Sequence, residues 1–152
     1  MTSDHISESS DLFARGYNCA QVVFTAFARD NGIDPGLAMK MATGLGAGIG
    51  RTGNICGAVC GAILAIGLIH GMSSPDEAAA KEKCYALDQK FIRQFISKYN
   101  SIQCPDLLGY NMAIPAEREE ARKMGVVNKI CPDLVRGAVE ILEEVLSEEK
   151  TS

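Results

Sequence analysis

The chain is organised around one long uncharged segment, Asn54-Ile-Cys-Gly-Ala-Val-Cys-Gly-Ala-Ile-Leu-Ala-Ile-Gly-Leu-Ile69. A helix that is apolar on every side must be covered by other parts of the protein or by lipid. The apolar stretch, about 15 residues long, is shorter than the roughly 20 residues that cross a bilayer. The segment therefore predicts the buried central helix of a small bundle, with Arg51 before it and His70-Gly71 at its end.

Small residues recur four apart in this segment. Gly57 and Gly61 form one such pair, and Ala58 and Ala62 form another. Residues four apart share one face of a helix, so each pair allows another backbone to approach closely. Since glycine inside a helix costs about 1 kcal/mol relative to alanine, these glycines indicate tight packing or a bulky group beside the helix.

The remaining sequence predicts further helices and no strands. Apolar residues recur at helical spacing, and no segment alternates with a period of two. Asn18, Asp34-Pro35 and Ser73-Ser74-Pro75 are typical helix starts. We therefore expect an all-α bundle of about five to six helices around the central one, forming a single domain over residues 1–152. The expected helices cover approximately residues 4–15, 18–27, 34–43, 75–99, 115–125 and 132–148.

A glycine run, residues 44–53, precedes the central helix. Its Gly48-x-Gly50-x-x-Gly53 spacing formally matches a dinucleotide-binding fingerprint, but that fingerprint follows a strand, whereas a helix is expected here. Arg51 stands where a Walker loop would have lysine. Two interpretations stay open: a tightly packed connector, or a backbone cradle whose N–H groups face an anion or a cluster at the start of the central helix.

Charge and termini limit the classes of partner. The net charge of −4 and the pI of about 5.2 give no electrostatic basis for binding nucleic acid or an anionic membrane. The first residues lack the basic and apolar regions of a signal peptide, so we expect a cytoplasmic protein. Six cysteines in a reducing compartment indicate metal binding or redox chemistry rather than a disulfide framework.

Four of the six cysteines are predicted at helix starts: Cys19, Cys56, Cys104 and Cys131. The last two each open the phrase Cys-Pro-Asp-Leu, whose proline and aspartate are typical of a first helical turn. The partial positive charge and free N–H groups of a helix N-terminus favour the thiolate, which binds metals and attacks disulfides. Four such thiols, from four different helix starts, could converge beside the glycine run.

The other two cysteines are expected to have lesser roles. Cys60 lies one turn after Cys56, where it would be an alternative ligand, a neighbour of the ligands or part of the core. Cys84 lies in the middle of a predicted helix on its apolar face, where a cysteine usually behaves as a small hydrophobic residue. The two histidines, His5 and His70, provide no Cys/His nucleophile pair, and no serine nucleophile elbow or catalytic carboxylate pair is present. Whether the protein is an enzyme stays open.

The order Cys19, Cys56-Gly57-Ala58-x-x-Gly61, Cys104, Cys131 resembles the C_GCAxxG_C_C family of redox-active proteins over nearly the whole chain. By position, the family's four cysteines fall on the same four that the helix-start argument selects. The resemblance implies redox activity or metal binding. A related domain occurs in split-Soret cytochromes, where an iron–sulfur centre is associated with it. This chain has no Cys-x-x-Cys-His motif, so haem is not implied.

Two chemical hypotheses follow, together with a simpler alternative. In the first, the four thiolates bind an iron–sulfur cluster for electron transfer or sensing, with zinc as a weaker alternative. In the second, no metal is bound and the thiols cycle between dithiol and disulfide. The alternative is a helical interaction module. The redox partner protein is undetermined, and a homodimer whose glycine faces meet, with a cluster bridging the subunits, stays open.

Overall fold

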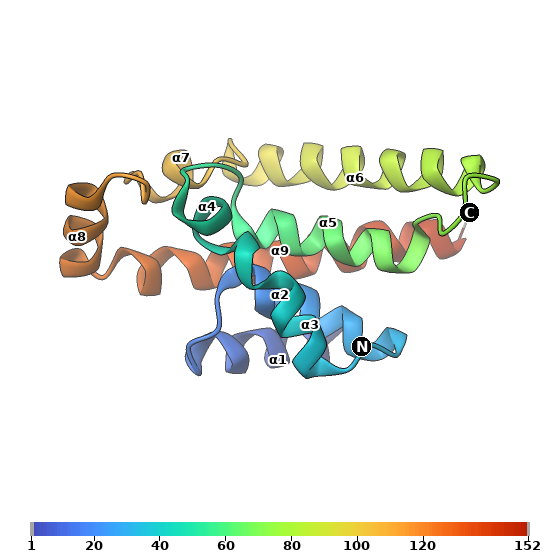
Figure 1. The fold of residues 1–152 in the computed structure, drawn as a ribbon, viewed down its shortest axis with the longest axis horizontal. Coiled ribbons are helices and arrows are strands. Elements are labelled where there is room, and N and C mark those ends of the chain that lie inside the picture. Colours follow the sequence, from blue (N-terminus) through green and yellow to red (C-terminus); the bar gives the residue numbers. More distant parts are fainter. Residues whose placement is uncertain (1, 152) are drawn as a thin grey trace.

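The computed structural model describes the backbone of residues 2–151 and the side chains of residues 4–148 (Figure 1). The described chain is all-α, as predicted, and contains no β-strand, only an isolated antiparallel bridge. Short 3-10 turns occupy Arg29–Asn31 and Thr43–Leu45. The helices are α1 (Thr2–Ala14), α2 (Cys19–Ala28), α3 (Pro35–Ala42), α4 (Gly46–Arg51), α5 (Gly57–His70), α6 (Ala78–Tyr99), α7 (Cys104–Leu108), α8 (Pro115–Met124) and α9 (Val126–Thr151).

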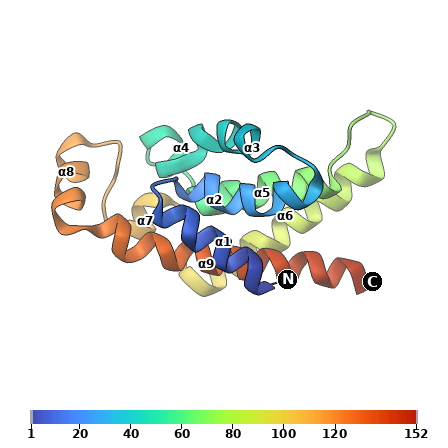
Figure 2. The ribbon, with the colours of Figure 1, turned by 90° about the horizontal axis from the view of Figure 1, so that it is seen from below.

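Helix α5 is the central helix that its composition predicts. It packs against α2, α6 and α9, and Figures 1 and 2 show it running through the middle of the bundle. Ala58, Ala62 and Ala65 are fully buried. A Cβ atom at Gly61 would lie 2.7 Å from the carbonyl oxygen of Ala20, so glycine is what lets α2 and α5 approach this closely. None of the described helices is long and apolar enough to cross a membrane.

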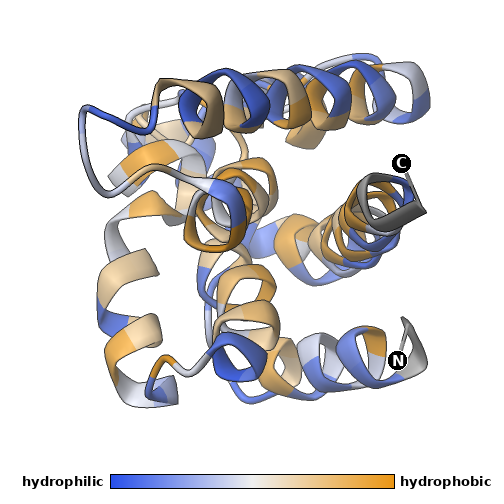
Figure 3. Ribbon diagram, turned by 90° about the vertical axis from the view of Figure 1, so that its right-hand side faces the viewer, coloured by the Kyte–Doolittle hydropathy of each residue, from blue (hydrophilic) through white to orange (hydrophobic). Residues whose placement is uncertain are grey.

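The aliphatic core is completed by aromatic residues of two helices. Phe91 and Phe95 of α6 and Phe24 of α2 are almost fully buried. The hydrophobic residues of the bundle face inward, and the outer side of α6 is hydrophilic (Figure 3). This is the pattern of a helix with one apolar stripe facing the core.

The helix starts at Asn18 and Asp34 are confirmed. The side-chain oxygen of Asn18 accepts a hydrogen bond from the N–H of Gln21, and the Gln21 side chain accepts one from the N–H of Asn18. The carboxylate of Asp34 accepts from the N–H of Leu37. Each cap satisfies a backbone donor that the helix itself leaves free, and the first cap fixes the position of Cys19.

The predicted start of the long helix at residue 75 is wrong, because α6 begins at Ala78. The carboxylate of Glu77 accepts hydrogen bonds from the backbone N–H and the hydroxyl of Ser73. The N–H of Glu77 in turn donates to the carbonyl of Ser74. Residues 73–77 therefore close a turn of their own before the helix starts.

The prediction that Cys131 lies at a helix start is also wrong. Helix α9 begins at Val126, so Cys131 and Pro132 lie inside it. Val126 and Cys131 are buried in a small apolar cluster with residues of α7 and α8, including Leu108 and Ala121. Burial of this first part of α9 offsets the cost of an internal proline, about 3 kcal/mol.

Candidate functional site

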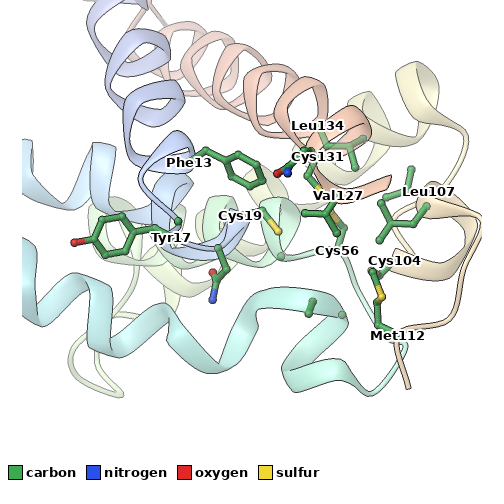
Figure 4. Close-up of a pocket in the computed structure, with 17 residues that line it drawn as sticks. Phe13, Tyr17, Cys19, Cys56, Cys104, Leu107, Met112, Val127, Cys131 and Leu134 are labelled. Atoms are coloured by element: carbon green, nitrogen blue, oxygen red, sulfur yellow. The ribbon is translucent and has the colours of Figure 1, made fainter. Parts of the chain in front are cut away.

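The four cysteines predicted to act together line one cavity of about 260 Å³. Cys19 is the first residue of α2, Cys56 caps α5, Cys104 is the first residue of α7, and Cys131 lies inside α9. Figure 4 shows Cys19, Cys56 and Cys131 close together, with Cys104 beside Met112. The rest of the lining is mostly apolar: Phe13, Gly16, Tyr17, Asn18, Ala47, Gly48, Gly57, Leu107, Leu108, Met112, Val127, Asn128 and Leu134.

A short backbone bridge brings two of these cysteines together. The segments before α5 and α7 form an isolated antiparallel bridge. The N–H of Cys56 donates to the carbonyl of Ile102 at 2.7 Å, and the N–H of Cys104 donates to the carbonyl of Asn54 at 2.8 Å. Each hydrogen bond holds the backbone of one cysteine against the other segment. Residues almost fifty positions apart in sequence are thereby fixed side by side.

The glycine run forms a left-handed turn beside these cysteines. Residues 47–51 all have positive φ, among them Ala47, Ile49 and Arg51, which are not glycine. This conformation costs about 1–2 kcal/mol for each L-residue. The hydroxyl of Thr52 donates to the carbonyls of Gly48 and Ile49, which holds the turn closed. Backbone strain of this kind is often found at functional sites.

Two glycines leave room for the cysteine side chains. A Cβ atom at Gly57 would lie 2.9 Å from the sulfur of Cys19. A Cβ atom at Gly48 would lie 3.0 Å from the Cβ atom of Cys104. Real Cβ contacts are longer than this, so any larger residue would displace the thiols.

The thiols differ in acidity because three of them are in contact. Hydrogen bonds from Cys131 and then from Cys56 lower the pKa of Cys19 well below its ordinary value, although burial opposes the shift. A hydrogen bond with the backbone of Ala47 acts in the same direction. The contact with Cys19, followed by burial, raises the pKa of both Cys131 and Cys56. Cys19 is therefore the thiol of this group whose pKa is lowered, and the pKa values of its two neighbours are raised.

Cys104 lies outside this hydrogen-bonded group. Burial, and then the negative charge of Cys19, raise its pKa to about 11. Over the described residues, no three Cys, His, Asp or Glu side chains converge closely enough to hold one metal ion. In a zinc site all ligand sulfurs lie about 2.3 Å from the metal. The cavity that the four cysteines line is larger than a single ion.

Cys60 and Cys84 do not line the cavity. The thiol of Cys60 donates to the carbonyl of Ile55 at 4.0 Å, and that of Cys84 lies 3.9 Å from a carboxylate oxygen of Asp88. Burial raises the pKa of both thiols. The four cysteines predicted to act together therefore share the cavity and the other two do not, although Cys131 does not lie at a helix start.

Several cavity-lining residues carry no signal in the sequence. Met112 and Val127 lie outside every motif that the sequence shows. Ala47 and Gly48 belong to the glycine run, for which one interpretation was a cradle facing an anion or a cluster. The apolar wall of the cavity could be recognised only after the helices were assembled.

The chain matches, over residues 17–145, the model of a family described as "Putative redox-active protein (C_GCAxxG_C_C)". The match spans most of the chain, including the four cysteines that line the cavity, and the protein belongs to this family. No curated protein and no solved structure matches the chain.

Proposed function

We propose that the protein binds an iron–sulfur cluster through Cys19, Cys56, Cys104 and Cys131, and that it functions in electron transfer or redox sensing. The observation that carries this proposal is the convergence of four thiols on one cavity. Thiolate ligands select iron–sulfur clusters or zinc. The cavity that these thiols line has room for a cluster of several atoms.

The size of the cavity supports an occupant. At about 260 Å³, and partly open to solvent, the cavity has room for a group of several atoms. A disulfide pair alone needs no such space. Gly48 and Gly57 keep the space open, because any side chain there would meet Cys104 or Cys19.

The thiols and the backbone around them suit this role. The contacts with Cys131 and Cys56 lower the pKa of Cys19, which favours its thiolate, and the other three thiols would lose their protons on binding. The contact with Cys19 and burial raise the pKa of Cys56, and the backbone N–H groups of Ala58 and Val59 oppose this rise; the backbone of Ala47 adds to the lowering of the pKa of Cys19. Backbone hydrogen bonds to cysteine sulfur also set the reduction potential of such sites. When bound, the cluster would supply one-electron transfer.

The test is to purify the wild-type protein and single Cys→Ser variants without oxygen and to measure bound iron, acid-labile sulfide and the visible spectrum. We expect Cys56→Ser and Cys104→Ser to lose most of the bound iron and sulfide. Cys84→Ser is the matched control, because its thiol does not line the cavity, and it should keep both. Equal iron in Cys56→Ser and Cys84→Ser would refute the assignment of ligands.

A second candidate is a thiol–disulfide protein without metal. It is favoured by the contact of the Cys19 sulfur with Cys131 and Cys56, because a low-pKa thiolate beside two thiols is the arrangement that forms and exchanges disulfides. Mild oxidation of the metal-free protein, followed by mass mapping, should then give a reversible bridge from Cys19 to one of the other two. If no bridge forms, this candidate is excluded.

A further inference from the structure

A second hollow adjoins the cysteine cavity. Its volume is about 490 Å³, and it shares Ala47, Met112, Val127 and Asn128 with the cavity. Helices α4 and α8, which flank it, lie at the same end of the bundle (Figures 1 and 2). We call this hollow the arginine groove, because it is also lined by Arg51, Arg118 and Arg122, together with Glu119, Ala121 and Gly125.

The charge of the arginine groove is opposite to that of the whole chain. Three arginines and one glutamate line it, which gives +3 − 1 = +2, whereas the chain carries −4. Positive charge concentrated in a hollow attracts anions and raises their local concentration. The sequence predicted no anion site of this kind, because the arginines come from α4 and α8, which are far apart in the chain.

The three arginines are held differently. Arg51 ends the left-handed turn with a φ of 66°, and no side-chain partner is found for it in the part of the chain that the structure describes. Arg118 is half-buried and donates to the carbonyl of Met112 at 3.0 Å. Arg122 is exposed and pairs with Glu119 through two hydrogen bonds of 2.7 and 3.0 Å. Of the three arginines that line the groove, Arg51 is thus the one without a side-chain partner among the described residues.

We propose that the arginine groove binds a small molecule that carries carboxylate or phosphate groups, with Arg51 as its principal contact. The planar guanidinium matches both groups with paired hydrogen bonds. The volume of the groove is within the range of small-molecule sites, about 300–1,000 Å³. Because the two hollows share walls, the anion would lie next to the cysteine cavity. This proposal does not depend on which cofactor, if any, the cysteines hold.

The test is a titration of the isotope-labelled full-length protein with inorganic phosphate and with succinate, followed by NMR at low ionic strength. Saturable shifts should appear at Ala47, Val127 and Asn128, and added salt should weaken binding because exposed charges are screened. Arg51→Gln should weaken binding at least tenfold, and Arg122→Gln should weaken it less. Arg93→Gln is the matched control, an exposed arginine on α6 that does not line the groove.

Three results would overturn the proposal. The first is the absence of saturable shifts with either anion. The second is equal affinity of Arg51→Gln and Arg93→Gln. The third is binding of a glutamate-rich peptide without binding of either small anion, which would assign the groove to a protein partner. The iron content of the Arg51→Gln variant separates this test from that of the cysteine site, because the groove proposal expects it to be unchanged.

Discussion

Replacing Gly61 by alanine tests the packing that places Cys19 beside the start of α5. The new Cβ atom would lie 2.7 Å from the carbonyl oxygen of Ala20 and 3.2 Å from its Cα atom. Both atoms are backbone, so the whole of α2 must move. Overpacking of this kind costs about 1–3 kcal/mol. Gly67→Ala is the matched control, because Gly67 lies in the same helix and a Cβ atom there would meet nothing within 4 Å.

Both substitutions gain about 1 kcal/mol of helix propensity. The difference between them therefore isolates the packing cost, and we expect Gly61→Ala to be less stable than Gly67→Ala by about 1–3 kcal/mol. Urea unfolding of the two variants measures this difference as a shift in midpoint at unchanged slope. Equal stabilities would refute the conclusion that glycine is needed for the contact of α2 with α5.

Two further predictions concern single polar side chains. Asn18→Ala removes the cap of α2 and a hydrogen bond of 3.0 Å to the carbonyl of Thr43, so it should lower the free energy of unfolding by about 1–2 kcal/mol, measured by urea unfolding. Burial raises the pKa of Asp88, one of whose oxygens is buried without a partner among the described residues. Because the folded-state pKa is the higher one, ionisation favours the unfolded state, and Asp88 destabilises the fold as the pH rises from the unfolded-state pKa through the folded-state pKa. Asp88→Asn should therefore stabilise the fold at pH 7, by up to about 1 kcal/mol. At a pH below both pKa values it should have no such effect. An equal effect at both pH values would contradict this explanation.

Much of the fold could be predicted because its signals are local. An uncharged run of small and aliphatic residues marks α5, and side-chain caps at Asn18 and Asp34 mark two helix starts. The choice of four cysteines among six also came from local signals, since three of them do lie at a helix start or cap. The fourth, Cys131, was selected for a wrong reason.

One error arose where tertiary packing outweighs a local signal, and the other where a local turn replaces the first turn of a helix. Pro132 indicates a helix start, but burial of Val126 and Cys131 against α7 and α8 extends α9 past it. A helix was expected to start at residue 75, and instead Glu77 closes a turn with Ser73. In each case the competing contact joins residues whose pairing the local pattern does not specify.

The arrangement of the site depends on interactions between distant segments. The left-handed turn at residues 47–51 includes Ala47, Ile49 and Arg51, which by themselves disfavour positive φ. The bridge that holds Cys56 against the segment of Cys104 consists of backbone hydrogen bonds only. Neither feature leaves a side-chain pattern, so the sequence could suggest that the thiols converge but could not supply the geometry.

The most direct measurement of the proposed function is the number of iron and acid-labile sulfide atoms bound per chain in protein purified without oxygen, together with the visible spectrum. The proposal predicts coloured protein that binds iron and sulfide in similar amounts. Replacing Cys19 by serine should remove the visible absorbance together with both bound elements. Colourless protein that binds neither iron nor sulfide after reconstitution would contradict the proposal.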